Sequence, residues 1–148
     1  MTRWPTPSSP EATARMKANR SRDTGAERRL RSELHRRGLR FLVDRRPNVP
    51  GLRSRPDVIF PRQRLAVFVD GCFWHRCPEH GTLPKANAQF WTAKLDANVD
   101  RDRRTTATLE AAGWRVVRIW EHVPASDAAD VIVAALRCQA RRGAFRAR

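Results

Sequence analysis

Apolar residues along the chain form short uninterrupted runs that turn residues separate. Residues 57–60, DVIF, and 65–71, LAVFVDG, are short and rich in β-branched side chains, with the turn PRQ between them. This pattern predicts two adjacent central strands joined as a hairpin. The runs WRVVRIW at 114–120 and LRFLVD at 39–44 predict two further strands.

Helical signals frame these strands. The tetrapeptide TGAE, residues 24–27, is a capping box, and it predicts a helix that Leu30 and Leu34 line with a narrow apolar stripe. Gly38 is the expected end of this helix. A closing helix is expected over 127–142.

A long helix is expected over residues 87–113, with Gly113 as its stop. Its apolar positions are spaced to bury one side, and they are Phe90, Leu95, Val99 and Leu109. The order of elements is therefore helix, three or four strands, helix, strand, helix. That order is typical of an α/β sandwich with a central mixed sheet flanked by helices.

A chain of 148 residues favours one domain. We expect the domain over residues 23–142, after a flexible basic arm, 1–22, and before a loose basic tail, 143–148. There is no signal-peptide pattern and no apolar run near 18 residues, so we expect a cytoplasmic protein without a membrane span.

Charge points to the partner. Thirty Lys and Arg oppose fifteen Asp and Glu, a formal net charge of +15. Such an excess repels itself in a compact chain unless a polyanion neutralises it, so nucleic acid is the expected partner. The charge also predicts association with the nucleoid. The alternative is a solvated basic surface that reflects a coding bias toward Arg.

Cysteine and histidine spacing predicts a zinc site. Cys72, Cys77 and His80 follow the pattern C-x4-C-x2-H, and zinc needs four tetrahedral ligands of thiolate or imidazole type. His122 is our choice for the fourth ligand, because its strand should lie beside residues 65–69; Cys138 is the competing choice. With four protein ligands the site would be closed and structural, so zinc would not catalyse a reaction. The alternative is a set of unrelated buried cysteines.

Asp57 and His75 are the candidates for chemistry. Asp57 follows a proline at the start of a strand, where phosphodiester nucleases hold Mg²⁺, and His75 is spare if the other histidines bind zinc. A histidine near such an acid could accept a proton from the attacking water. The next strand lacks the usual lysine, and its only acid is Asp70. The alternatives are that Asp57 is a turn residue and that His75 takes the zinc in place of His80.

Phe73 and Trp74 are adjacent on the same loop. Neighbouring rings on a tethered loop should not both point into one core, so at least one should project outward. A projecting ring beside a basic surface suits insertion between base pairs. The alternative is that both rings shield the metal.

Several motifs together resemble the very short patch repair (Vsr) family of DNA mismatch endonucleases. They are RDTGAERRLRSEL, SRPD, GCFWHRCPEH and the stretch FWTAKLDANVDRDRRTTATLEAAGWRVVRIWEH, and the likeness runs from about Met16 to Ala140. The resemblance implies a restriction-endonuclease-like core with structural zinc. It also implies Mg²⁺-dependent nicking of one strand 5′ to the T of a T:G mismatch produced by deamination of 5-methylcytosine.

The resemblance further implies a role for each matching residue. These are Asp57 and the backbone carbonyl of Val69 for Mg²⁺, His75 as the catalytic histidine, Glu27 as an acid acting through ordered water, Asp102 as an acid orienting the histidine, Phe73 and Trp74 as an intercalating pair, Met16 as an apolar wedge from the opposite groove, and Cys72, Cys77, His80 and His122 for zinc. A known member has Thr-His where this chain has Val69-Asp70, which makes Asp70 a further candidate ligand for Mg²⁺.

The expected partner is therefore double-stranded DNA with a T:G mismatch, bound by a monomer. Contact with mismatch-repair proteins is implied by the resemblance alone. Two alternatives remain open from the sequence: a restriction-type endonuclease of the same fold with another DNA substrate, and a non-enzymatic zinc-containing module that binds DNA.

Overall fold

A computed structural model describes residues 4–18 and 23–145, with the backbone alone for 16–18 and 139–145. Seven elements follow one another along the chain. They are α1 (Pro10–Ala18), α2 (Gly25–Arg36), β1 (Val58–Phe60), β2 (Leu65–Asp70), α3 (Ala88–Ala111), β3 (Arg115–Trp120) and α4 (Ala125–Phe145).

The three strands form one mixed sheet in the order β1-β2-β3. β1 and β2 pair antiparallel, with Val58 opposite Val67, so the predicted hairpin is confirmed. β2 and β3 pair parallel from Leu65 opposite Arg115 to Asp70 opposite Trp120. Because the two longer strands are parallel, both deliver their carboxyl ends to the same edge of the sheet.

The prediction of a strand over residues 39–44 is wrong. In this stretch Leu42 forms only an isolated bridge to Ile59, with an N–H···O bond of 2.9 Å in one direction and 3.0 Å in the other. Asp44 then turns away with φ of 58°, and the proline-rich loop begins. Leu42 and Val43 stay largely exposed. A short apolar stretch without a second partner strand is therefore insufficient to extend the sheet.

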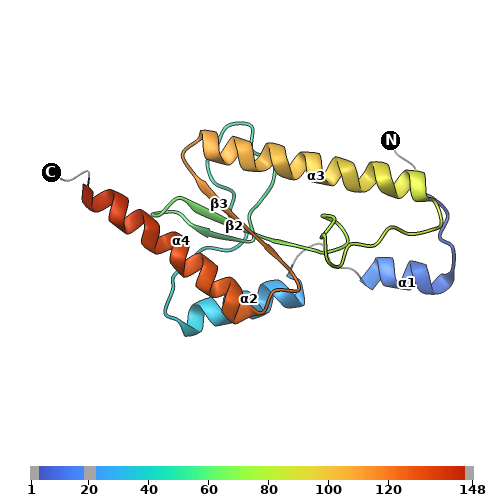
Figure 1. The fold of residues 1–148 in the computed structure, drawn as a ribbon, viewed down its shortest axis with the longest axis horizontal. Helices are drawn as coiled ribbons and strands as arrows, with labels where there is room; N and C mark the ends of the chain where they lie inside the picture. The colour runs from blue at the N-terminus through green and yellow to red at the C-terminus, as the bar shows by residue number, and fades with distance from the viewer. Residues whose placement is uncertain (1–3, 19–22, 146–148) are drawn as a thin grey trace.

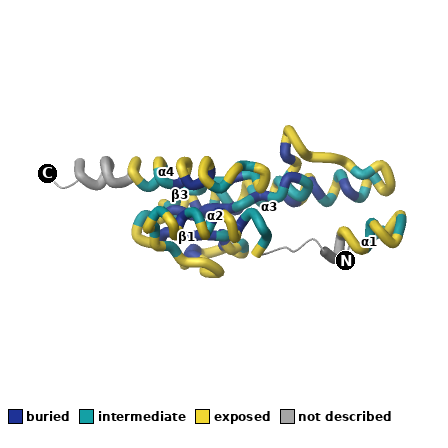
Figure 2. The backbone as a smooth tube through the Cα atoms, turned by 90° about the horizontal axis from the view of Figure 1, so that it is seen from below, coloured by how far each residue is buried: buried dark blue, intermediate teal, exposed yellow. Residues whose placement is uncertain are grey.

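Helices cover both faces of the sheet (Figure 1). On one face α2 and α4 pack against alternate strand residues, among them Val58, Phe60 and Val67. On the other face the C-terminal part of α3 and residues 49–52 cover Ile59, Ala66 and Phe68. In Figure 2 the buried positions gather on the strands and on the inner sides of these helices. The predicted α/β architecture with a mixed sheet is confirmed.

The ends of α2 follow the sequence signals. The Thr24 hydroxyl accepts the Glu27 N–H at 3.3 Å, and the Glu27 carboxylate accepts the Asp23 N–H at 2.8 Å. At the other end Gly38 has φ of 76°, and the N–H groups of Gly38 and of the next residue bond back into the last turn. A left-handed residue here is favoured as glycine because it has no Cβ.

Helix α3 is longer than the sheet is wide. Its C-terminal half packs on the sheet, and its N-terminal half extends past it beside α1 (Figure 1). Leu95 and Leu109 are buried as predicted, whereas Phe90 and Val99 are half-buried and Trp91 is buried instead. None of the described helices combines the length and apolarity that crossing a membrane requires.

Candidate active site and thiolate–imidazole cluster

The loop after β2 is held in place by hydrogen bonds to two neighbouring elements and within itself. Cys72 donates its N–H to the Glu121 carboxylate beyond β3 at 2.8 Å, and the Asn98 side chain of α3 donates to the Trp74 carbonyl at 3.2 Å. Within the loop the Cys77 N–H bonds to the Cys72 carbonyl at 2.9 Å. A Cβ at Gly81 would collide with the Cys77 carbonyl, so this turn requires glycine.

Cys72, Cys77, His80 and His122 come together as predicted, with one ligand atom of each within 4.8 Å of the others. The Cys72 Sγ lies 3.1 Å from the His122 Nδ1, and the Cys77 Sγ lies 3.9 Å from the His80 Nδ1. Burial and the neighbouring Cys77 raise the pKa of Cys72 to about 11, so its thiolate needs a nearby cation. Two thiolates and two imidazoles at this spacing fit tetrahedral zinc.

Cys138 does not join this cluster. It is exposed on α4, so the alternative fourth ligand is excluded by its place in the fold. His122 reaches the thiols because β3 runs parallel to β2 and ends beside it.

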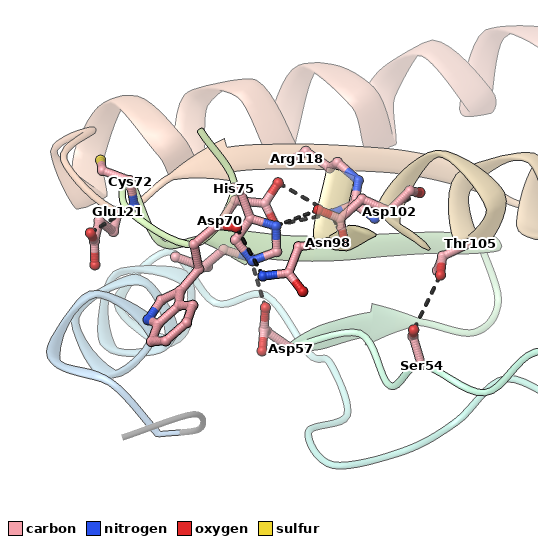
Figure 3. Close-up of polar contacts among 12 residues, drawn as sticks. Ser54, Asp57, Asp70, Cys72, His75, Asn98, Asp102, Thr105, Arg118 and Glu121 are labelled. Carbon is pink, nitrogen blue, oxygen red and sulfur yellow. Dashed lines mark hydrogen bonds and ion pairs between the residues drawn. The ribbon is translucent and has the colours of Figure 1, made fainter. Parts of the chain in front are cut away.

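His75 turns away from the thiols toward two acids (Figure 3). Its Nδ1 makes a short hydrogen bond to the Asp102 carboxylate on α3, and the Asp70 carboxylate lies 3.8 Å from the same nitrogen. Burial lowers the pKa of His75, but the Asp102 hydrogen bond and the charges of Asp70 and Asp102 outweigh it and raise the pKa above its ordinary value. With Nδ1 engaged, Nε2 is the nitrogen left to accept a proton.

Asp57 is tied to β2 at the base of the site. Its N–H bonds to the Val67 carbonyl at 2.9 Å, and its carboxylate accepts the Val69 N–H at 2.7 Å. Burial raises the pKa of Asp57 to about 7; the Val69 hydrogen bond opposes this rise, and the charges of Glu27 and Asp70 add to it. Asp57 thus lies in a site where a carboxylate is costly without a cation.

Asp57 and Glu27 line one cavity of about 400 Å³. Asp23 and Asp44 line it too, with Arg31 and Arg55 as its two cations. A cavity whose walls present several carboxylate oxygens fits a hard divalent cation such as Mg²⁺. The capping glutamate of α2 and the acid before β1, 30 positions apart in sequence, are therefore brought together.

Phe73 and Trp74 are half-buried, and both pack on α3. Their ring centroids lie 5.1 Å apart, and Trp91 lies 5.5 Å from Phe73 and 6.1 Å from Trp74. Each ring keeps part of its surface exposed while it packs against Trp91. Met16 lies in α1, but its side chain falls outside the part of the chain that the structure describes.

Residues of the N-terminal segment complete this aromatic cluster. The Trp4 ring lies 5.9 Å from Phe90 and 6.2 Å from Trp91, with the Lys94 ammonium 5.1 Å from its centroid. A mostly apolar cavity of about 370 Å³ lies between this segment and Phe73. Sequence reasoning missed Trp4 and Trp91; their signal was the unusual count of five tryptophans in 148 residues.

Arg118 is a further member of the site that the sequence analysis missed. It stands at the middle of β3 and bonds to Asp70 at the end of β2 and to the Asp102 carbonyl on α3. The available signal was a single charged residue between apolar ones in VVRIW. The charge of Asp70 also raises the pKa of both Asp57 and His75, so it acts on both parts of the site.

Comparison with known proteins gives one consistent result. The family model described as DNA mismatch endonuclease Vsr matches residues 8–79. The type II nicking enzyme V.NaeI of Lentzea aerocolonigenes is 42% identical over 131 residues, which cover 88% of this chain and 79% of that protein. The type II nicking enzyme V.XorIIP of Xanthomonas oryzae is 44% identical over 72% of this chain and 76% of its own length. The DNA mismatch endonuclease Vsr of Escherichia coli is 41% identical over 72% of this chain and 66% of its own length.

Proposed function

Because the chain belongs to the Vsr family of DNA mismatch endonucleases and is a DNA endonuclease, we propose that it nicks one strand 5′ to the T of a T:G mismatch, in a reaction that requires Mg²⁺. The observation that carries this proposal is the meeting of two groups at one edge of the sheet. His75 is held by Asp102 and lies beside Asp70, and the carboxylates of Asp57 and Glu27 line one cavity.

His75 is proposed as the general base. Asp102 fixes Nδ1 and thereby the orientation of the ring, so that Nε2 accepts the proton of the attacking water. His75 must be neutral to do this. Because its pKa is raised, the neutral fraction grows only as the pH rises through that higher pKa.

Asp57, the Val69 carbonyl and Glu27 are proposed to hold the Mg²⁺ site. Asp57 supplies the direct carboxylate, and Glu27 faces the same cavity to hold water there. When bound, the cation would stabilise the negative charge that develops on the phosphate and the leaving oxygen. The core that holds these acids is proposed to be of the restriction-endonuclease-like type.

Cys72, Cys77, His80 and His122 are proposed to bind structural zinc. Four protein ligands would leave no position for water, so the metal would brace the loop that carries His75. The same bracing would fix Phe73 and Trp74, which lie between Cys72 and His75 in sequence.

Phe73, Trp74 and Met16 are proposed to insert into the duplex at the mismatch. Unstacking a base step costs about a few kcal/mol, and less where the bases are mispaired, so a wedge would favour the mismatch. Phe73 and Trp74 must first leave their packing against Trp91. The formal charge of +15 would supply the non-specific grip on DNA and a steep dependence of affinity on salt.

A second candidate is strand nicking at a different DNA substrate. Two of the three similar proteins described above are named type II nicking enzymes, and their names state no mismatch. Membership of an endonuclease family disfavours the other alternative, a non-enzymatic zinc-containing module.

An oligonucleotide assay distinguishes the proposed mismatch-nicking function from these alternatives. A T:G duplex and its T:A and C:G parents are incubated with the protein and Mg²⁺ across a panel of flanking sequences, and we expect one nick, in the T strand of the mismatch alone. Cutting of both strands of a paired duplex would establish a restriction-type enzyme, and binding without cleavage would contradict the enzymatic proposal.

Substitutions assign the roles. We expect Asp57→Ala and His75→Ala each to abolish nicking while zinc content and circular dichroism stay those of the unaltered protein. Asp100→Ala, at an exposed acid of α3, is the matched control and should nick normally. Loss of zinc from His75→Ala would show that His75 is a ligand and would overturn its role as base.

A further inference from the structure

Arg118 joins the three elements that surround His75. Its Nη1 donates to both oxygens of Asp70, at 3.0 and 3.2 Å, at the exit of β2. Its Nη2 donates to the backbone carbonyl of Asp102 at 3.2 Å, and its Nε donates to the Thr106 hydroxyl at 3.1 Å, both on α3. One side chain of β3 therefore cross-links β2 to α3 where His75 lies (Figure 3).

The positive charge of Arg118 offsets the negative charges of two neighbouring carboxylates. Asp70 and Asp102 both lie within 4.0 Å of the His75 Nδ1, and Asp70 is only 7% exposed. A buried carboxylate is costly unless it is paired and hydrogen-bonded. The Arg118 Nη1 also lies 3.8 Å from the Asp102 carboxylate, so one guanidinium serves both acids.

The guanidinium itself is held in position. Its central carbon lies 4.4 Å from the centroid of the Phe68 ring, on the residue that pairs with Arg118 across the parallel ladder. Each of its three nitrogens already donates to a protein group. Its effect on a reaction must therefore pass through Asp70 and Asp102, and contact with DNA would require giving up these bonds.

We propose that Arg118 is a positioning residue of the nuclease site, which sets the place of Asp102 and Asp70 around His75 and acts as the resident cation of this cluster. The proposal rests on the proposed function, in which His75 is the base. It also assigns Asp70 to the histidine. The oxygens of Asp70 and Asp102 and a nitrogen of His75 lie within 4.8 Å of one another, a spacing that could suit a divalent ion, but Arg118 already holds both oxygens of Asp70.

The test compares two replacements of Arg118. Arg118→Met keeps a long stem over Phe68 and removes the charge, whereas Arg118→Lys keeps the charge and loses the fork that spans β2 and α3. Arg104→Met is the control, because it removes the same charge from an exposed position of α3. Each protein is measured with zinc bound for its dissociation constant on the proposed T:G duplex and for its single-turnover nicking rate at saturating enzyme with Mg²⁺.

We expect Arg118→Met to lower the single-turnover rate about 10- to 100-fold, part of the 10²–10⁴-fold that a positioned base contributes. Its dissociation constant should stay within about threefold of that of Arg104→Met, since both lose one charge. The nicking rate of Arg118→Lys should fall between those of Arg118→Met and Arg104→Met. A weakened affinity with an unchanged rate at saturation would show that Arg118 contacts DNA and would overturn the proposal.

A readout without DNA or Mg²⁺ separates this proposal from the nuclease function. The chain has four histidines, so the ¹⁵N imidazole signals of His75 can be assigned by their loss in His75→Ala. In the unaltered protein we expect the Nδ1–H proton to be protected from exchange with water by its hydrogen bond to Asp102. In Arg118→Met we expect this proton to exchange with water and the signals of the two ring nitrogens to be averaged. Unchanged His75 signals in Arg118→Met would refute the positioning role even if the protein nicks. If the protein does not nick but the signals change, the positioning stands and the base role falls.

A double variant keeps the test decisive if Arg118→Met folds poorly. Asp70→Asn with Arg118→Met removes both charges, so no buried carboxylate is left unpaired. We expect the double variant to be more stable than Arg118→Met alone. Additive destabilisation would contradict the coupling between the two side chains that the distances indicate.

Discussion

Replacing Asp57 by Asn is expected to stabilise the protein at pH 8 while it abolishes nicking. Burial raises the pKa of Asp57 to about 7, with the charges of Glu27 and Asp70 adding to the rise and the Val69 N–H opposing it. Each tenfold change in proton affinity is worth about 1.36 kcal/mol, so a rise from 3.8 to about 7 is worth roughly 4 kcal/mol of lost stability at most. Asn removes the charge and keeps an oxygen to accept the Val69 N–H.

The gain should depend on pH in a defined way. An acid with a raised pKa in the folded state favours folding only while it keeps its proton. Near pH 4 Asp57 is largely protonated in the folded protein, and the cost of its charge is small; the cost grows as the pH rises toward 7 and is complete above it. We therefore expect Asp57→Asn to unfold at the same urea concentration as the unaltered protein near pH 4, and to be about 2–4 kcal/mol more stable at pH 8.

Urea unfolding at both pH values, in zinc-containing buffer without Mg²⁺, measures the difference. A gain of this size should also raise the melting temperature by roughly 5–10 °C for a chain of this length. Asp100→Asn, at an exposed acid of α3, is the control and should change stability little at either pH. Mg²⁺ should stabilise the unaltered protein and not Asp57→Asn, since a ligand stabilises only the state that binds it. An equal gain at both pH values, or none at pH 8, would refute the reasoning that burial of the charge is costly.

Three further outcomes are expected. His122→Ala should lose most of its zinc and unfold at lower urea concentration, whereas Cys138→Ala should retain one zinc per chain; the reverse result, by metal analysis, would show that the fourth ligand was misassigned. Phe73→Ala combined with Trp74→Ala should reduce the preference for the T:G duplex over its T:A parent more than it weakens binding to either, and an equal loss on both duplexes would contradict wedging. Asp102→Asn should lower the maximal nicking rate and move the acid limb of its pH profile to lower pH, because it removes a charge that raises the pKa of His75 and leaves only an uncharged acceptor; an unmoved limb would show that His75 does not set it.

Local signals in the sequence predicted most of the fold. The hairpin, the cap of α2 by Thr24 and Glu27, and the stop of α3 before Gly113 each depend on a few neighbouring residues, and the structure confirms all three. The expected strand at 39–44 failed because a strand depends on partners that its own residues do not encode.

Part of the candidate site was also predicted from local signals in the sequence. Three members of the thiolate–imidazole cluster lie within nine residues, and a correct placement of β3 beside β2 supplied His122. Arg118 and Trp4 could not be found this way. Arg118 reads as one more cation among thirty, and only the packing of α3 on β3 brings it to Asp70 and Asp102.

Glu27 has two duties in this molecule. Its carboxylate holds the backbone at the start of α2, and it also lines the cavity that Asp57 shares. The position is therefore pleiotropic: a replacement that altered reactivity would at the same moment fray a helix, and one that preserved the helix would have to keep an oxygen in the cavity. Glutamine, which retains an oxygen but not the charge, is the substitution through which evolution could separate these duties, and natural descendants that carry it would be expected to fold well and nick slowly.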